Sequence, residues 1–348
     1  MASEIRADLS GGKRPRPKVS ICIPSYNNSS LIGHAIRSAL GQTFGDIEVI
    51  VVDNNSADDS ERVVRSFGDE RIRFSKNSKN IGMTRNWNKC ISMASGEFVC
   101  LLCADDMHLP KFAERAVSML EAHPNLGFVH CAYRIMDEWG ETTSEFKVQA
   151  NDSVDKGHVF FDKIIHGNFA TISGVMIRRA CLEKLGCFDD TLAYAPDWEL
   201  LARISLHYDV GYISEPLACY RFHEGNFTYS FKKSNRIIHE VFKTIDRICS
   251  DWEEVRPRDS EPLNSSALKS EYVTGMLGVR LDCSSAGALR KSIAEEVSKN
   301  RRKAMDLRLA IPFVVSYLGI RTAVVFLYPS KMANTMLVRT LNKVDRLI

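Results

Sequence analysis

The amino-acid sequence predicts an α/β fold in which a mostly parallel sheet carries helices on both of its faces. Two observations carry this prediction. From Val19 to about residue 223, short apolar runs alternate with helical patterns, and this alternation is typical of parallel strands joined by crossover helices. The run FVCLLC at 98–103 is apolar throughout, as expected for a strand that is covered on both sides.

The first hundred residues contain a leader and then four predicted strands. Residues 1–17 combine Gly, Pro and charge without apolar periodicity, which predicts a disordered leader. The predicted strands are VSICIP at 19–24, IEVIVVD at 47–53, a short strand near Ile72, and EFVCLLC at 97–103. The predicted helices between them run from Ser30 to Leu40, from Asp58 to Phe67 and from Gly82 to Ala94.

The next segment continues the same alternation around a polar excursion. A helix is expected from Pro110 to Ala122, because proline is tolerated in a first helical turn. The stretch at 137–167 is polar at its start, and we expect it to shape a substrate site. The other predicted elements are the strands at 126–133 and 171–179, helices at 179–186 and 197–206, and a strand pair at 209–214 and 217–223.

Beyond residue 227 the pattern becomes helical, with helices predicted at 234–250, 266–283 and 286–304. We therefore expect a domain at 18–230 and a helical C-terminal region at 231–348. Seven basic residues against three acids at 290–308 precede an apolar stretch at 310–328 that Pro312 and Arg321 interrupt. An interrupted stretch does not predict a membrane-spanning helix. It suits a helix lying on an anionic membrane surface, or alternatively a helix pair packed on the first domain.

Composition excludes several classes of protein. Of 348 residues, 45% are hydrophobic and 26% charged, and the net charge is +3; this is a globular composition that gives no reason to expect a nucleic-acid partner. Ten cysteines without an apolar signal peptide in the first 20 residues indicate a reducing, cytoplasmic location. Cys100 and Cys103 have the spacing of a zinc knuckle, but in a strand they point to opposite faces, so no zinc site is expected.

Polar segments follow the first two strands, where open α/β sheets bind ligands. The first is IPSYNNSS at 23–30, and the second strand ends in Asp53, which can bond a base or a ribose. Neither strand is followed by GxGxxG or by GxxxxGK. This absence argues against a dinucleotide oxidoreductase and a P-loop phosphotransferase, and the lack of a glycine-rich phosphate loop with a basic residue argues against a nucleotidyltransferase.

Two further segments have residues that could bind charged ligands: the first suits an anion and the second a cation. In KNIGMTRNWN at 79–88, Asn80 lies at a predicted helix start, Gly82 permits close backbone approach, and Arg85 follows one turn later. Helix N-termini and arginines both favour anionic groups. Asp105 and Asp106 follow the apolar strand directly, and adjacent carboxylates there need compensation, for which a hard divalent cation is suited. A capped turn is the alternative.

The last two segments contribute an acid and a basic pair. Asp197 opens a predicted helix, where it would act either as an N-cap or in chemistry. In YRFHEGNFT at 220–228, Arg221 and His223 alternate along a strand and therefore share a face. Such a pair suits a diphosphate or a metal.

The order and spacing of these six segments resemble glycosyltransferase family 2. The matching residues are Pro24-Ser25-Tyr26-Asn27, Asp53, Asn80 to Asn86, Ala104-Asp105-Asp106, Pro196-Asp197-Trp198 and Arg221-Phe222-His223. The resemblance implies a GT-A nucleotide-diphospho-sugar transferase fold with a Rossmann-like sheet. Two departures are Ala104, where the acidic motif usually has its first carboxylate, and Pro196, where an acid usually precedes the catalytic aspartate.

The resemblance also implies a function and roles for individual residues. It implies an inverting transferase that moves a sugar from a nucleotide-diphosphate donor to an acceptor hydroxyl. If the C-terminal segment lies on a membrane, the acceptor expected is a lipid-linked or surface glycan at the inner face of the cytoplasmic membrane. Asp197 would be the general base, and Asp106 with His223 would hold Mg²⁺ or Mn²⁺. The donor-binding residues would be Pro24, Tyr26, Asn27, Asp53, Asn80, Gly82, Arg85, Asp105 and Arg221. The alternative is a catalytically silent regulatory protein that binds a nucleotide sugar.

Overall fold

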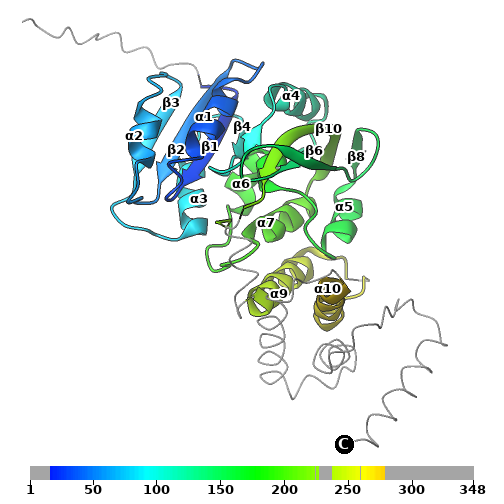
Figure 1. Ribbon diagram of the computed structural model, residues 1–348. Helices are drawn as coiled ribbons and strands as arrows, with labels where there is room; N and C mark the ends of the chain where they lie inside the picture. Colours follow the sequence, from blue (N-terminus) through cyan, green and yellow to red (C-terminus); the bar gives the residue numbers. More distant parts are fainter. Residues whose placement is uncertain (1–15, 224, 227–236, 259, 279–348) are drawn as a thin grey trace, which may run out of the picture.

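A computed structural model describes residues 16–278, except 224, 227–236 and 259, and shows a single ten-stranded sheet (Figure 1). Eight strands follow the order β3-β2-β1-β4-β9-β6-β10-β5, while β7 pairs with β6 and β8 pairs with β10. Helices lie on both sides of this sheet. The predicted α/β fold class is confirmed.

The N-terminal half of the sheet is parallel, as predicted. Its strands are β1 (Val19–Ser25), β2 (Ile47–Asp53), β3 (Ile72–Lys76) and β4 (Phe98–Leu101). They are connected by α1 (Ile32–Leu40), α2 (Ser60–Arg65) and α3 (Met83–Ser92). Because all four strands run in one direction, the loops that follow β1, β2 and β4 meet at one edge of the sheet.

The second half of the sheet is mixed. Its strands are β5 (Met107–His108), β6 (Leu126–Met136), β7 (Thr142–Phe146), β8 (Ser153–Asp155), β9 (Val175–Arg178) and β10 (Asp209–Arg221). The strand β9 is antiparallel to both β4 and β6, whereas β6 and β10 are parallel to each other. The sheet is therefore parallel from β3 to β4 and mixed beyond, in agreement with the mostly parallel sheet that the sequence predicts.

The predicted strand pair at 209–214 and 217–223 is one long strand, β10. The register against β6 shifts on both sides of Pro216, where the missing N–H cannot join the ladder. The first part of β10 pairs with β8 and the last part with β5. The chain thus bends around Pro216 without leaving the sheet.

Further helical elements follow in the described residues. They are α4 (Phe112–Ala122), α5 (Gly157–Ile164), the 3₁₀ turn η1 (Ile172–Gly174), α6 (Arg179–Leu185), α7 (Pro196–Ser205), α9 (Ile237–Val255) and α10 (Ser265–Gly278). None of the helices in this part of the chain is long and apolar enough to cross a bilayer. The predicted helix at 286–304 and the apolar stretch at 310–328 lie outside the described residues.

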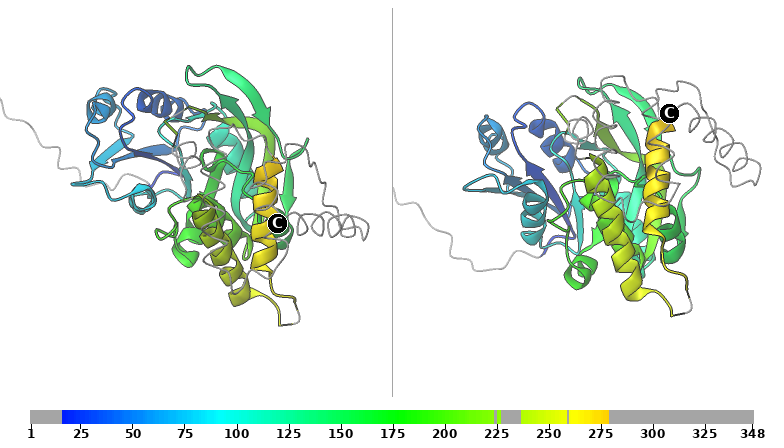
Figure 2. Two further views of the ribbon diagram at one scale, coloured as in Figure 1. Left: turned by 60° about the horizontal axis from the view of Figure 1, so that its bottom comes forward. Right: turned by 90° about the horizontal axis from the view of Figure 1, so that it is seen from below.

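Two apolar cores flank the sheet, because side chains alternate along each strand. Ile21 and Ile23 pack with α1 and α4, whereas Cys22 faces the opposite core, to which α3, α5, α6 and α7 contribute. Buried side chains of α9, including Ile238 and Val241, belong to that same core. Figure 1 shows α9 and α10 below the α/β unit, and Figure 2 shows that they lie side by side. The first helices of the C-terminal region therefore pack on the α/β unit.

Candidate functional site

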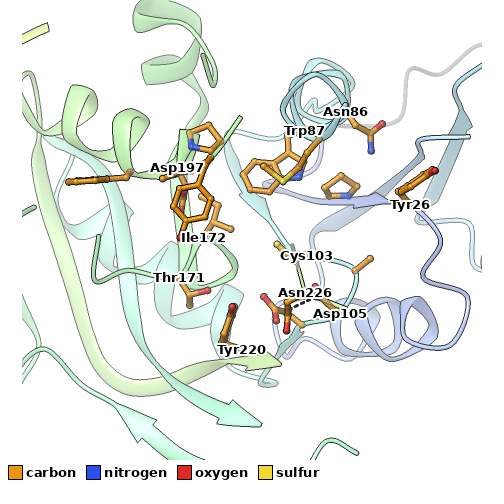
Figure 3. A pocket seen from close by; sticks show the side chains of 18 of the residues that line it. Tyr26, Asn86, Trp87, Cys103, Asp105, Thr171, Ile172, Asp197, Tyr220 and Asn226 are labelled. Atoms are coloured by element: carbon orange, nitrogen blue, oxygen red, sulfur yellow. Dashed lines mark hydrogen bonds between the residues drawn. The ribbon is translucent and has the colours of Figure 1, made fainter. Parts of the chain in front are cut away.

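A cavity of about 960 Å³ lies where the loops after β1 and β4 face the start of α7 (Figure 3). Of the residues that sequence analysis assigned to a site, it is lined by Pro24, Tyr26, Asn27, Asn80, Gly82, Asp105, Asp106 and Asp197. Figure 3 shows Tyr26 and Asp197 at opposite ends of it. The structure thus brings together segments that are up to about 170 residues apart in the chain.

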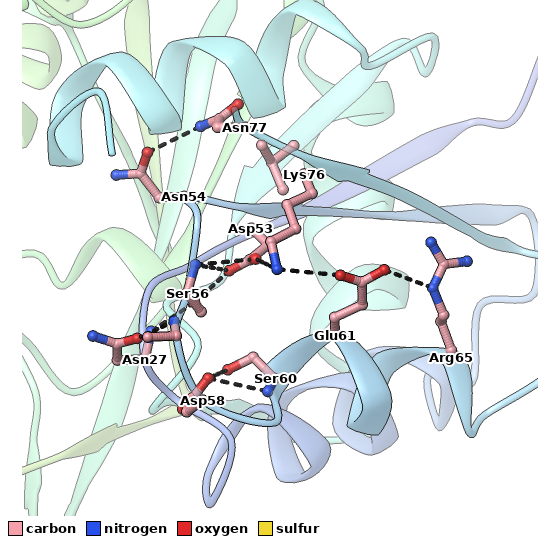
Figure 4. Close-up of polar contacts among 12 residues, drawn as sticks. Asn27, Asp53, Asn54, Ser56, Asp58, Ser60, Glu61, Arg65, Lys76 and Asn77 are labelled. Carbon is pink, nitrogen blue, oxygen red and sulfur yellow. Dashed lines mark hydrogen bonds and ion pairs between the residues drawn. The ribbon is translucent and has the colours of Figure 1, made fainter. Parts of the chain in front are cut away.

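Asp53 lies beneath the cavity wall rather than in it. Its carboxylate is 1% exposed and accepts hydrogen bonds from the Ser56 backbone N–H, at 3.2 Å, and from the Ser56 hydroxyl. That hydroxyl oxygen in turn accepts a bond of 2.8 Å from the Asn27 backbone N–H (Figure 4). Lys76 lies 3.6 Å from Asp53. Asp53 therefore fixes the loop after β2 against Asn27, which has a left-handed backbone with φ of 52°.

A network of asparagine amides holds the start of α3 against the loop after β2. Asn54 donates to Asn80 Oδ1 at 2.9 Å and to the Gly82 carbonyl at 3.3 Å. Asn77 donates to Asn54 at 2.9 Å and to Asn86 at 2.9 Å. Gly82 has φ of 89°, a conformation that favours glycine. Sequence analysis did not single out Asn54, which lines the cavity, although its place directly after a buried strand was a signal.

Asp106 is buried and fully hydrogen bonded. It is 2% exposed, and it accepts bonds from the Ser173 hydroxyl at 2.6 Å and from the Arg221 backbone N–H at 2.8 Å. Burial, and then the charge of Asp105, raise the pKa of Asp106 well above its usual range. Both of its oxygens already have protein donors, so Asp106 buttresses the acidic loop from below.

Asp105 is the more accessible of the two acids. One oxygen, Oδ2, lies 3.1 Å from His223 Nε2 and 2.9 Å from Asn226 Nδ2. Figure 3 shows the Asn226 contact at the cavity. His223 does not itself line the cavity, but it holds the carboxylate that does.

The two predicted arginines do not line the cavity. Arg221 is 3% exposed; its Nε donates to the Asp105 carbonyl at 2.8 Å, and its Nη1 donates to the carbonyls of Asp137 and Glu138 at 3.1 Å each. Arg85 forms an ion pair of 2.8 Å with Asp190, and 64% of its side chain is exposed. Arg221 therefore ties the acidic loop to the turn that follows β6, and Arg85 is a surface residue.

The acidic loop fits a hard divalent cation. Ligand atoms of Cys103, Asp105 and Asp106 all lie within 4.8 Å of one another. A cation there would offset both the burial and the neighbouring charge of Asp105, which together raise the pKa of Asp106. Burial, and then Asp106 and Asp105, hold the pKa of the Cys103 thiol well above its usual range. The thiol thus stays protonated, which leaves the oxygens as ligands. The sequence pattern had placed Cys103 only in a rejected zinc pair with Cys100, and not beside the two acids.

Asp197 lies in the first turn of α7 and points into the other end of the cavity (Figure 3). The helix cap is Ala195, which has a left-handed φ of 56°, so the alternative that Asp197 is the N-cap is wrong. Asn168 Nδ2 donates to Asp197 Oδ2 at 2.8 Å. Burial raises the pKa of Asp197 to about 6. Such a carboxylate is a stronger base than an exposed one and is still ionised near neutral pH.

The cavity wall near Asp197 is aromatic, which sequence analysis missed. The aromatic side chains that line this part are Trp87, Phe169, Tyr194, Trp198 and Tyr272. They come from α3, α7, α10 and the loops before η1 and α7. No single motif contains them, so only the tertiary structure brings them together.

Comparisons with known proteins agree with this architecture. A family model described as glycosyl transferase family 2 matches residues 20–186. An uncharacterized glycosyltransferase of Rickettsia typhi is 30% identical over 217 residues, covering 61% of this chain and 66% of that protein. A Campylobacter jejuni protein named GalNAc(5)-diNAcBac-PP-undecaprenol beta-1,3-glucosyltransferase is 35% identical over 134 residues, covering 37% of this chain and 42% of that protein.

A solved structure shows the same fold. S. aureus TarS, residues 1–349, solved in complex with UDP-GlcNAc, is 18% identical with a TM-score of 0.62, and the match covers 86% of this chain and 89% of that one. The sheet described above is therefore the GT-A fold. The chain spans 66% and 42% of the lengths of the two relatives just named. The family model matches residues 20–186 within the α/β unit, and this part of the chain is a glycosyl transferase family 2 domain.

Proposed function

We propose that this protein is an inverting glycosyltransferase that moves a sugar from a nucleotide-diphosphate donor to an acceptor hydroxyl. The observation that carries the proposal is the cavity itself, which has a partly buried base, Asp197, at one end and the acidic loop of Asp105 and Asp106 toward the other. Glycosyl transfer needs both a proton acceptor and compensation for a departing diphosphate.

In this proposal Asp197 accepts the proton of the attacking hydroxyl. Asn168 donates to one carboxylate oxygen and so orients the carboxylate, which lines the cavity where the acceptor would lie. Of the described residues that line the cavity, the carboxylates are Asp105, Asp106 and Asp197. With one carboxylate at the acceptor end and no second one beside it to act as nucleophile, a single displacement follows, and this inverts the anomeric carbon.

The donor would lie against the loops of the N-terminal half. Pro24, Tyr26 and Asn27 line the nucleotide end of the cavity, and Asn80 and Gly82 line the start of α3. Asp53 would position this wall through Ser56 rather than contact the donor directly.

A Mg²⁺ or Mn²⁺ ion would be held chiefly by Asp105, with His223 orienting that carboxylate and Asp106 supporting the loop from below. When bound, the ion supplies positive charge against the departing diphosphate. Arg221 has no role as a donor ligand in this proposal; it positions Asp105 through the backbone carbonyl of that residue.

A silent nucleotide-sugar-binding protein is the second candidate, favoured by one observation. Cys103 and Ala104 put no carboxylate ahead of Asp105 in the acidic loop. A thermal-shift screen of nucleotide sugars with Mn²⁺ identifies the donor, since a ligand that binds the native state raises its melting temperature. Assaying release of the nucleoside diphosphate from that donor then separates the two candidates.

The pH dependence of activity is expected to follow Asp197. Because its pKa is raised to about 6, kcat/KM should fall about tenfold per pH unit below about pH 6, as the base becomes protonated. The measurement is a pH profile of kcat/KM at saturating divalent cation. A profile that stays flat down to about pH 4, the ordinary range of aspartate, would contradict the role of Asp197.

The acceptor is proposed to be a hydroxyl of a lipid-linked or surface glycan, used at the inner face of the cytoplasmic membrane. This choice is supported by the name of the Campylobacter jejuni relative, because the name includes a glycan linked to PP-undecaprenol. The basic residues at 290–308 and the apolar stretch at 310–328 support contact with an anionic membrane surface.

Deleting residues 305–348 tests the membrane proposal. The full chain is expected to sediment with vesicles that contain anionic lipid and to be released by high salt, because the attraction is partly electrostatic. The truncated chain should stay in the supernatant while donor binding is unchanged. Equal sedimentation of both chains would refute the role of this segment.

A further inference from the structure

The helix α10 lies against the end of the cavity that holds Asp197. Tyr272, from the middle of α10, lines the cavity, and its ring stacks on Trp198 with centroids 5.8 Å apart and an interplanar angle of 24°. Trp198 directly follows Asp197 in α7. The helix that carries the proposed base thus supports an aromatic ring supplied by a segment about 75 residues further along the chain.

A second contact fixes α10 at the same place. Glu271, the neighbour of Tyr272, lies 3.0 Å from His166 Nδ1. His166 precedes the loop that carries Asn168, the hydrogen-bond partner of Asp197. Consecutive residues of α10 therefore contact both segments that position the proposed base.

The helix α10 is also attached to α9. Lys269 forms an ion pair of 2.5 Å with Asp246, and Ser265 donates to the same carboxylate at 2.6 Å. Since the buried face of α9 belongs to the core that includes α7, α10 is connected to the α/β unit at both its start and its middle. Tyr272 is accordingly held in place by contacts outside the cavity.

The surface that results has the chemistry of a sugar subsite. Trp198 donates its indole N–H to the Ile164 carbonyl at 2.6 Å, so this N–H already has a partner. The ring face of Trp198 supports the ring of Tyr272. Tyr194 lines the same end of the cavity. A pyranose has an apolar C–H face and a rim of hydroxyls, which an aromatic ring with a phenolic hydroxyl can match.

We propose that Tyr272, supported by Trp198 and accompanied by Tyr194, binds a pyranose ring of the acceptor beside Asp197. The acceptor would therefore present a sugar, rather than a bare phosphate or a lipid chain, to the base. The first helices after the α/β unit would complete the acceptor subsite. This inference rests on the proposed function, because it takes the end of the cavity near Asp197 as the acceptor end.

The test compares the wild-type full chain with Tyr272→Phe and Tyr272→Leu. Tryptophan fluorescence reports binding of the methyl glycosides of glucose, galactose, N-acetylglucosamine and N-acetylgalactosamine, because Trp87 and Trp198 line the cavity. At least one glycoside is expected to bind wild type saturably. Tyr272→Phe keeps the ring and should bind within about threefold of wild type, whereas Tyr272→Leu keeps the burial and should bind about tenfold more weakly.

Lys269→Ala is the matched control on α10, because it breaks the ion pair with Asp246 without changing the cavity wall. Because Ser265 still donates to Asp246 and Glu271 still contacts His166, α10 should stay attached, and glycoside affinity should stay within about threefold of wild type. If Lys269→Ala weakens binding as much as Tyr272→Leu, the effect belongs to helix packing and the proposal is overturned. It is equally overturned if no glycoside binds wild type, or if Tyr272→Leu binds as wild type does.

Donor measurements separate this inference from the proposed function. In Tyr272→Leu, donor affinity in the presence of Mn²⁺ and slow hydrolysis of the donor by water are both expected to match wild type. If wild type neither binds nor hydrolyses any donor, the proposed function fails. If wild type does both and Tyr272→Leu binds glycosides normally, only the acceptor subsite fails.

Discussion

Replacing Asp197 with asparagine is expected to lower kcat by at least about 10²-fold while donor affinity stays nearly the same. In wild type, Asn168 donates to Asp197 at 2.8 Å. Asparagine at position 197 has the same shape as aspartate and keeps an oxygen that can accept this bond, so the cavity should keep its form. What the substitution removes is basicity. The measurement is kcat together with the donor dissociation constant, for wild type and variant, at saturating divalent cation.

Asp190→Asn is the matched control, because Asp190 is an exposed acid that pairs with Arg85 outside the cavity. It should leave kcat unchanged.

The pKa of Asp197 also predicts a change in stability. Because burial raises this pKa from its ordinary value to about 6, the ionised form opposes folding above that pH, so Asp197→Asn should melt higher than wild type at alkaline pH. Near-normal turnover in Asp197→Asn would exclude Asp197 as the base.

Replacing Asp105 with asparagine is expected to remove most of the effect of Mn²⁺ on nucleotide binding. Asp105 faces the cavity, where His223 and Asn226 hold one of its oxygens, and a neutral amide is a much weaker ligand for a hard cation. The measurement is the dissociation constant of UDP, GDP, CDP and dTDP with and without Mn²⁺. The binding that remains should resemble that of wild type without the cation.

Asp106→Asn distinguishes the roles of the two neighbouring acids. Asp106 accepts one bond at each oxygen, from Ser173 and from the Arg221 backbone N–H. Asparagine replaces one of these oxygens with an amide NH2 that cannot accept, so one of the two bonds is lost. We therefore expect Asp106→Asn to lose about 1–3 kcal/mol of stability in addition to weakening Mn²⁺-dependent binding, whereas Asp105→Asn should melt close to wild type. Glu138→Gln, an exposed acid near the same loop, is the control that should change neither property. If Asp105→Asn responds to Mn²⁺ as wild type does, Asp105 is not the principal metal ligand.

The parallel half of the fold could be predicted because its signals are local. Apolar runs marked β1, β2 and β4 to within one or two residues, and the intervening periodicity marked α1 and α3. The segment between β6 and β9 gave weaker signals. The strand β7 is almost wholly exposed, so it has no apolar alternation, and α5 is only two turns long. Two strands were predicted at 209–214 and 217–223, whereas the register shifts around Pro216 and β10 continues.

The sequence motifs predicted those site residues that line the cavity because of their local position in the fold. Tyr26, Asp105 and Asp197 line the cavity because each follows or precedes a core element at the binding edge of the sheet. Arg221 matches the family motif in position, but its guanidinium donates hydrogen bonds to three backbone carbonyls and does not line the cavity. Such long-range hydrogen bonds leave no local pattern, and the same is true of the aromatic wall around Tyr272.

The central claim is that this cavity transfers a sugar from a nucleotide donor with Asp197 as the base. Its most direct test is to incubate the purified full chain with each of a panel of nucleotide sugars, Mn²⁺ and a mixture of methyl glycosides, and to measure nucleoside diphosphate release and the anomeric configuration of the product. We expect release from one donor; this release should depend on the cation and be lost in Asp197→Asn, and the product should have the inverted configuration. Binding of a donor without any release, or a product that retains the donor's configuration, would contradict the central claim.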